Sequence, residues 1–282
     1  MPSVSLPMIL APFAVLALAS AVAAVLNRRA GGRPDPTLLN LTQRINAWWV
    51  MVILLTGAFL IGKSAIILLF AFVSFAALRE FVTLTYSSRS DHWVLLAMFG
   101  VILPFQYWLV WTEWYGLFTI FIPVYCFLLM PAVTALRGDT SRYLERVAQQ
   151  QWAIMIAVYC ISHVPFLLFL AVPGFEGRQT MLIVFLIVVV QGSDVLQYIF
   201  GKLFGRHRVF TPFAPLQAGL VALMICTLGF LGGLVASAIK RDQGVKDWGH
   251  LIEGHGGMLD RADSLVFAAP IFFHIVRYYW TV

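Results

Sequence analysis

The sequence predicts an all-α fold, a polytopic integral membrane protein with about nine transmembrane helices. Of its 282 residues, 61% are hydrophobic and only 11% are charged, whereas soluble domains carry about 25% charged residues. Apolar runs of the ~20 residues that a helix needs to cross a bilayer recur along the whole chain. Most Trp residues lie near the ends of these runs, as in an interfacial aromatic belt.

The predicted spans divide the chain into two regions. Residues 1–150 hold N-terminal membrane helices, and residues 151–282 form a C-terminal membrane region with a cytoplasmic polar segment, 237–263, where the active site is expected. The first span is followed by Asn27-Arg28-Arg29 and lacks a basic stretch before it, which favours a membrane span over a signal peptide. Residues 28–44, with two Gly and two Pro, are predicted to form a connector. The predicted spans are 6–26, 46–61, 64–81, 92–111, 115–136, 151–172, 180–200, 214–236 and 265–281.

The charge and the cysteines exclude two classes of function. The net charge of +6 comes mostly from Arg beside the spans, which the positive-inside rule explains, so we expect no nucleic-acid partner. The three cysteines are scattered through apolar runs, so they form neither a disulfide framework nor a metal site.

The orientation of the spans leads to a conflict near residue 210. With the N-terminus outside, twelve basic residues fall on the inside, and only Lys63 and Arg178 fall on the outside. A full crossing by residues 214–236 would then place the basic polar segment outside. We therefore expect either that a segment is missing near Val209–Thr211, or that residues 214–236 fold back without crossing.

The polar segment Ser237–Asp263 is the one sizeable polar stretch in the C-terminal half. Carboxylates can hold a hard metal ion, Lys and Arg can bind phosphate, and Gly lets the backbone approach a ligand closely. Asp260 and Asp263 are three residues apart and share one face of a helix. Upstream, Asp194 lies within an apolar run, which makes it a functional candidate, although a buried acid paired with a neighbouring base remains the alternative.

The segment resembles the signature of the phosphatidate cytidylyltransferase (CDP-diacylglycerol synthase) family. The resemblance covers the C-terminal third well, and its many fixed positions make a chance match improbable. Upstream, Asp194 is followed by a Gly-rich basic loop with Lys202, and Leu78-Arg79-Glu80-Phe81 adds a weaker match. The matching residues are Ser237, Lys240-Arg241, Lys246-Asp247, His255-Gly256-Gly257 and Asp260-Arg261-Ala262-Asp263.

The resemblance implies a nucleotidyl transfer from CTP to phosphatidic acid, with Mg²⁺ as the cofactor. It also implies a bacterial inner-membrane protein whose active site faces the cytoplasm, in contact with the lipid bilayer; a homodimer is left open. We predict that the acids converge on one cleft, and that Asp260→Asn and Asp263→Asn abolish turnover without unfolding the protein. The residues expected to act are Lys240, Arg241, Lys246, His255 and Arg261 in catalysis, Lys202, Gly256 and Gly257 in nucleotide binding, and Asp194, Asp247, Asp260 and Asp263 at the metal.

One departure from the family supports a second hypothesis. Family members typically carry a Ser-Pro-x-Lys-x-Thr-x-Glu-Gly loop and a further span, but here Arg208–Pro212 runs almost directly into the next apolar run. A non-catalytic relative that binds lipid phosphate and metal but lacks the CTP-binding loop is therefore the alternative. A transporter ranks last, because the sequence shows no internal repeat.

Overall fold

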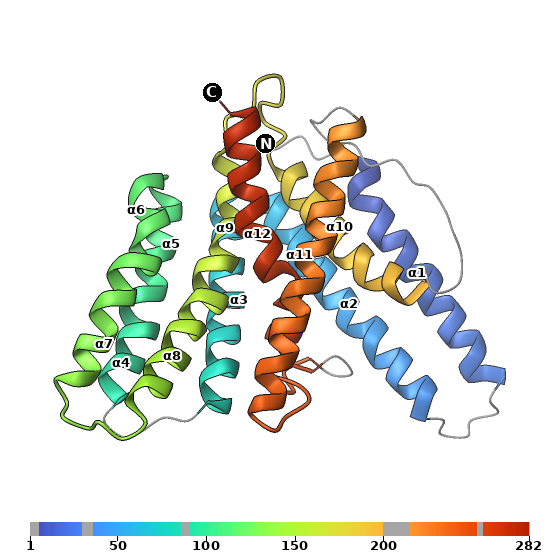
Figure 1. The fold of residues 1–282 in the computed structure, drawn as a ribbon. Helices are drawn as coiled ribbons and strands as arrows, with labels where there is room; N and C mark the ends of the chain where they lie inside the picture. Colours follow the sequence, from blue (N-terminus) through green and yellow to red (C-terminus); the bar gives the residue numbers. More distant parts are fainter. Residues whose placement is uncertain (1–5, 30–35, 86–90, 200–214, 253–255, 282) are drawn as a thin grey trace.

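The structure is a computed structural model that describes residues 6–29, 36–85, 91–199, 215–252 and 256–281 (Figure 1). These residues are almost all helical, and an isolated bridge between Ile252 and Gly256 is the one β-type pairing among them. Seven stretches within this part of the chain are long and apolar enough to cross a membrane. The prediction of an all-α polytopic membrane protein is confirmed, but the count of about nine spans is not.

The helices follow the chain with few long connections. Three π-helical segments join shorter helices into continuous rods: η2 (Met98–Ile102) follows α4, η3 (Phe121–Cys126) follows α6, and η4 (Met155–Cys160) follows α8. A 3₁₀ turn, η5 (Leu167–Phe169), ends the third rod. The α-helices are α1 (Leu6–Arg29), α2 (Pro36–Ile61), α3 (Lys63–Leu84), α4 (His92–Ala97), α5 (Leu103–Trp111), α6 (Tyr115–Ile120), α7 (Phe127–Ala135), α8 (Tyr143–Ile154), α9 (Ile161–Phe166), α10 (Thr180–Ile199), α11 (Pro215–Asp242) and α12 (Met258–Trp280).

Two predicted loops are partly helical. The connector predicted over residues 28–44 gives way to α2 at Pro36, because proline at the first position of a helix has a suitable φ and needs no donor there. Residues 137–150 lie between two predicted spans, but α8 begins within them at Tyr143, and its Arg146 is fully buried. Its guanidinium lies 2.6 Å from the Asp139 carboxylate and 3.6 Å from that of Asp91, so this basic residue is part of a buried ion cluster.

The core is centred on α3, α9 and α12, which contact one another. Within it, Tyr107 donates to the carbonyl oxygen of Phe70 and lies 2.7 Å from the Ser74 hydroxyl. α11 lies along α12, and small residues allow a close approach. A methyl group on Gly232 would lie 2.6 Å from the carbonyl oxygen of Asp263. This packing fixes the start of α12, where the signature acids stand.

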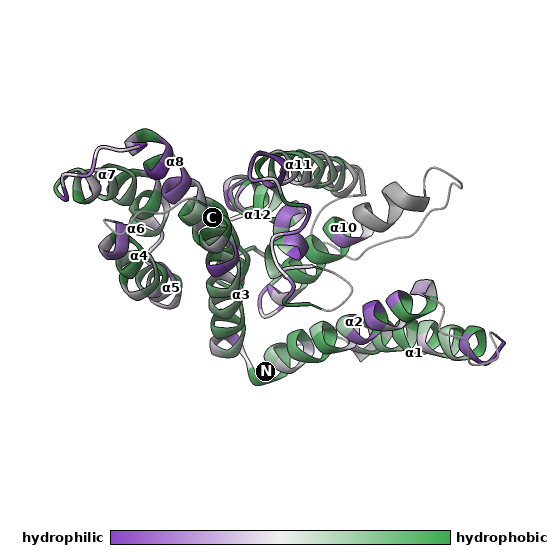
Figure 2. Cartoon of the chain, turned by 90° about the horizontal axis from the view of Figure 1, so that it is seen from below, coloured by the Kyte–Doolittle hydropathy of each residue, from purple (hydrophilic) through white to green (hydrophobic). Residues whose placement is uncertain are grey.

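The polar segment lies at the same end of the molecule as the basic residues near the C-terminal ends of α1, α3 and α7. In Figure 1, α11 runs the height of the molecule and α12 runs back beside it, so their connection lies at the same end as the C-terminal ends of α1, α3 and α7. Figure 2 looks onto this end and shows hydrophilic residues there between hydrophobic helix walls. The prediction that residues 214–236 fold back is therefore wrong, because α11 is continuous. The alternative, a missing segment near Val209–Thr211, falls outside the described residues.

Candidate active site

The polar segment folds against α3 and α12 through Trp248. The indole of Trp248 is 1% exposed and stacks on Phe81 of α3, with ring centroids 5.0 Å apart. The Trp248 backbone N–H donates to Asp260 Oδ2 at 2.8 Å. Burial of an aromatic side chain of this size fixes the backbone segment that carries it. The positions of Asp247 and Gly249, on either side of Trp248, are therefore fixed as well.

A buried ion pair joins the end of α11 to the start of α12. Lys240 Nζ lies 2.7 Å from Asp260 Oδ1, and the two side chains are 11% and 6% exposed. The other oxygen of Asp260 accepts from the N–H groups of Trp248 and Gly257. Both oxygens of this carboxylate therefore hold the polar segment and the helix together. The metal role predicted for Asp260 stays a prediction.

The first turn of α12 is capped by Glu80, which stands on α3. The N–H groups of Met258 and Leu259 donate to the two carboxylate oxygens of Glu80 at 2.7 and 2.8 Å. A carboxylate at a helix N-terminus satisfies donors that lack partners within the helix and is favoured by the helix dipole. Glu80 thereby ties α3 to the helix that carries Asp260 and Asp263.

The glycines of the signature fit these carboxylates closely. Gly256 has φ +83°, which favours glycine, and a methyl group there would lie 2.7 Å from Asp260 Oδ2 and 3.3 Å from Asp247 Cβ. A methyl group on Gly257 would lie 2.4 Å from Glu80 Oε2. The structure thus brings Asp247, Gly256, Gly257 and Asp260 together around one turn.

The other predicted residues are less closely gathered. Arg241, Lys246 and Asp247 are exposed, and Arg241 donates to the carbonyl oxygen of Val245 at 3.3 Å. Arg261 is partly buried, and its Nε has no hydrogen-bond partner among the described residues. Asp263 is partly buried on α12 and accepts from the backbone N–H of Ser264.

Three predicted residues cannot be placed in the site. Lys202 and His255 lie outside the described residues, and the side chain of Asp194 does too, although its backbone belongs to α10. One turn before it, Gln191 donates to the carbonyl oxygen of Arg261 at 3.4 Å, so α10 meets α12 beside the signature. Within the part of the chain that the structure describes, no three His, Cys, Asp or Glu side chains form a metal cluster. Convergence of Asp194 with the other acids stays a prediction.

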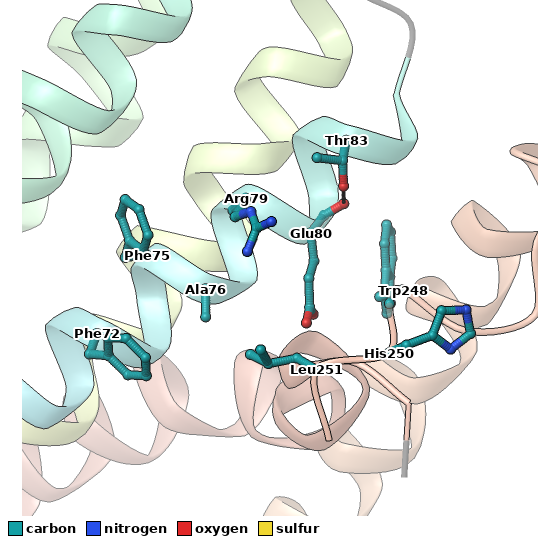
Figure 3. A pocket seen from close by; sticks show the side chains of 10 residues that line it. Phe72, Phe75, Ala76, Arg79, Glu80, Thr83, Trp248, His250 and Leu251 are labelled. Atoms are coloured by element: carbon teal, nitrogen blue, oxygen red, sulfur yellow. Dashed lines mark hydrogen bonds between the residues drawn. The ribbon is translucent and has the colours of Figure 1, made fainter. Parts of the chain in front are cut away.

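A pocket of about 360 Å³ lies between α3 and the polar segment (Figure 3). One wall comes from α3, and the other comes from the residues that follow Asp247 in the chain. The residues that line it are Phe72, Phe75, Ala76, Arg79, Glu80, Thr83, Trp248, Gly249, His250 and Leu251.

The site residues from α3 were largely missed from the sequence. The signal available was Arg79-Glu80, a charged pair within an apolar span, which is unusual enough to mark a functional position. Trp248 and His250 stand beside the signature Asp247, and nothing in the local pattern indicates that they face α3.

Comparison with known proteins identifies the family of this site. The model of the cytidylyltransferase family matches residues 42–217 and 211–279. YnbB of Escherichia coli K12, an uncharacterized protein, is 36% identical over 267 residues, covering 84% of this chain and 87% of the relative. The phosphatidate cytidylyltransferases of Staphylococcus saprophyticus and of Staphylococcus aureus strain COL are 30% and 29% identical over 160 residues. Each of these alignments covers 44% of this chain and 61% of the relative.

The relatives carry residues that have no counterpart here. The alignment with YnbB has 267 positions, which is more than 84% of a chain of 282 residues, so some positions face gaps in this chain. The staphylococcal alignments, with 160 positions over 44% of this chain, also contain positions that face gaps in this chain. The family match is also divided at residues 211–217. With matches that together extend from residue 42 to residue 279, and with a site built on the family's acidic and glycine-rich signature, this chain belongs to the cytidylyltransferase family.

Proposed function

We propose that this chain transfers a cytidylyl group from CTP to phosphatidic acid, and that it does so at the cytoplasmic face of a bacterial inner membrane. The observation that supports this most is the arrangement around Asp260. Lys240, Trp248 and Gly257 hold its carboxylate, and Asp247 and Gly256 stand beside it. The turn that carries the family signature is therefore folded, in a chain that belongs to the family.

The chemistry requires charge neutralisation more than covalent participation by the protein. A phosphate oxygen of phosphatidic acid attacks the α-phosphorus of CTP, and the bond from that phosphorus to the β-phosphate oxygen breaks. The products are CDP-diacylglycerol and pyrophosphate, which leaves with the electron pair of the broken bond. In this proposal the exposed side chains of Arg241 and Lys246 bind nucleotide phosphates, and Lys240 and Glu80 position the turn.

Mg²⁺ is the proposed cofactor, and the exposed Asp247 and the partly buried Asp263 suit it better than the buried Asp260. Asp247 offers hard oxygen ligands beside the glycine turn and Asp263 offers them further along α12, whereas Asp260 is already bound by a lysine and two N–H groups. Mg²⁺ held there, with Asp194 as a further proposed ligand, would neutralise phosphate charge during the transfer.

A direct assay tests the proposed reaction. We expect purified protein in mixed micelles to convert α-labelled CTP into labelled CDP-diacylglycerol, with one pyrophosphate released per lipid formed. The rate should require both phosphatidic acid and Mg²⁺, and Lys246→Gln should lower it because a phosphate contact is lost. The exposed Arg137→Gln at the same end of the molecule serves as the control. Label in lipid without added phosphatidic acid, or no transfer by protein that binds both substrates, would contradict the proposal.

A non-catalytic lipid-binding relative is the second candidate. Two observations favour it: the relatives carry residues that have no counterpart in this chain, and the family match is divided at residues 211–217. A loop that contacts CTP and is absent here would leave lipid binding intact and remove CTP binding. Equilibrium dialysis with CTP separates the two candidates, because only the enzyme retains the nucleotide. Inserting the loop and span from a relative would then be expected to restore CTP binding.

A further inference from the structure

The pocket between α3 and the polar segment is lined by both apolar and basic side chains. Phe72 and Phe75 of α3 and Leu251 of the polar segment are exposed large apolar residues at its edge. α3 is one of the seven stretches long and apolar enough to cross a membrane, so its exposed Phe72 and Phe75 are suited to contact lipid acyl chains. The opening is therefore suited to a ligand that enters from the bilayer and not from water alone.

Two basic residues line the pocket, Arg79 on the wall from α3 and His250 on the wall from the polar segment, and Glu80 and Trp248 stand between them (Figure 3). Arg79 is exposed on α3, and His250 is exposed on the polar segment (Figure 3). Among the described residues, neither side chain makes a hydrogen bond or an ion pair. A guanidinium with no protein partner, at the mouth of an aromatic-lined pocket, is suited to bidentate recognition of a phosphate.

The remaining polar groups of the pocket are compatible with an anion. The carboxylate of Glu80 also lines the pocket, but its two oxygens already accept from N–H groups at the N-terminus of α12, which stabilises its charge there. Trp248 lines the pocket, and its buried indole N–H has no partner among the described residues. The volume of about 360 Å³ suits a phosphoglycerol headgroup and leaves the acyl chains outside, against α3.

We propose that this pocket binds the acceptor lipid, with the phosphate of phosphatidic acid on Arg79 and the start of its acyl chains on Phe72 and Phe75. The proposal rests on the proposed function for the identity of the lipid. Its location suits the reaction, because Trp248 in the pocket wall directly follows the signature Asp247. A phosphate held there lies beside the turn that is expected to bind CTP.

A kinetic comparison tests the assignment of Arg79. In mixed micelles, Arg79→Gln is expected to raise the KM for phosphatidic acid about 10- to 100-fold, the loss of one charge-assisted contact. The KM for CTP should change less than about twofold, because the nucleotide lies elsewhere in this proposal. Arg137→Gln, which removes an exposed arginine from the same end of the molecule, is the control and should leave both values unchanged. A rise in the KM for CTP alone would overturn the assignment and make the pocket a nucleotide site.

A binding experiment gives a readout that does not depend on turnover. Protein in nanodiscs is irradiated with phosphatidic acid that carries a diazirine near the acyl carbonyl, without CTP, and the labelled peptides are sequenced. We expect label on the peptides that contain Phe72, Phe75 and Leu251. Arg79→Gln should reduce this label at least severalfold, and unlabelled phosphatidic acid, but not phosphatidylcholine, should compete with it.

The two experiments separate the fate of this proposal from that of the proposed reaction. Label at the pocket in a protein that does not transfer a cytidylyl group supports the lipid site and removes the enzymatic function. Transfer activity with label confined to other helices, or label that Arg79→Gln does not change, overturns the lipid site and leaves the function standing. Phe72→Ala should also reduce the label, whereas its matched control Leu68→Ala, at an exposed residue one turn earlier on α3, should not.

Discussion

Asp260→Asn is expected to destabilise the protein as well as stop turnover, which is more than the sequence alone predicts. The amide keeps an acceptor for the N–H groups of Trp248 and Gly257, but it leaves the charge of Lys240 without a partner. Removal of one member of a buried ion pair costs about 3–5 kcal/mol. We expect a loss at the lower end of this range, since 11% of the Lys240 side-chain surface is exposed to solvent.

Two further variants separate stability from chemistry. Asp263→Asn is expected to lose turnover with a smaller change in stability, because Asp263 is only partly buried whereas Asp260 is buried. Lys240→Met combined with Asp260→Asn should recover much of the lost stability without recovering activity, since no unpaired charge remains. Thermal unfolding can be followed with a thiol-reactive dye, because Cys126 is buried and the other two cysteines are partly buried. Equal stability of the two single Asp→Asn variants would contradict the structural role of Asp260.

The sequence predicts the fold class and the signature turn because both depend on local patterns. Hydropathy identifies the membrane helices, and the spacing of Asp260 and Asp263 places them on one helix, as α12 confirms. The pairing of Lys240 with Asp260 can also be predicted from the sequence, because both residues belong to one polar segment of the chain.

Other features depend on contacts between distant residues, and the local pattern does not reveal them. Glu80 caps a helix that begins 178 residues later in the chain, so its role becomes visible only when α3 and α12 are packed together. In the same way, Trp248 reads as a loop residue until its indole is seen to stack on Phe81. The charge count indicates that a crossing is missing before α11, and this stays a prediction because residues 200–214 lie outside the part of the chain that the structure describes.

Gly257→Ala is expected to loosen the whole start of α12 by displacing Glu80. The backbone of Gly257 has φ −87° and ψ 172°, which alanine adopts without strain, so the effect is steric. The added methyl group would lie 2.4 Å from Glu80 Oε2, and the carboxylate cannot move away without losing its bonds to Met258 and Leu259. Hydrogen bonds to a charged group contribute about 1.5–3 kcal/mol each, so we expect a loss of about 3 kcal/mol.

A double-mutant cycle distinguishes this mechanism from a general disturbance of the glycine turn. Glu80→Ala alone should cost about as much as Gly257→Ala, because both remove the same two bonds. In the Glu80→Ala background the Gly257→Ala change should then cost almost nothing, since the atom that it meets is gone. Gly233→Ala on α11 is the control, because a methyl group there meets nothing within 4 Å. Additive losses from the two substitutions would show that Gly257 is needed for some reason other than its contact with Glu80. Coupled losses, with turnover falling in parallel, would establish that a residue on α3 holds the signature acids of α12 in place.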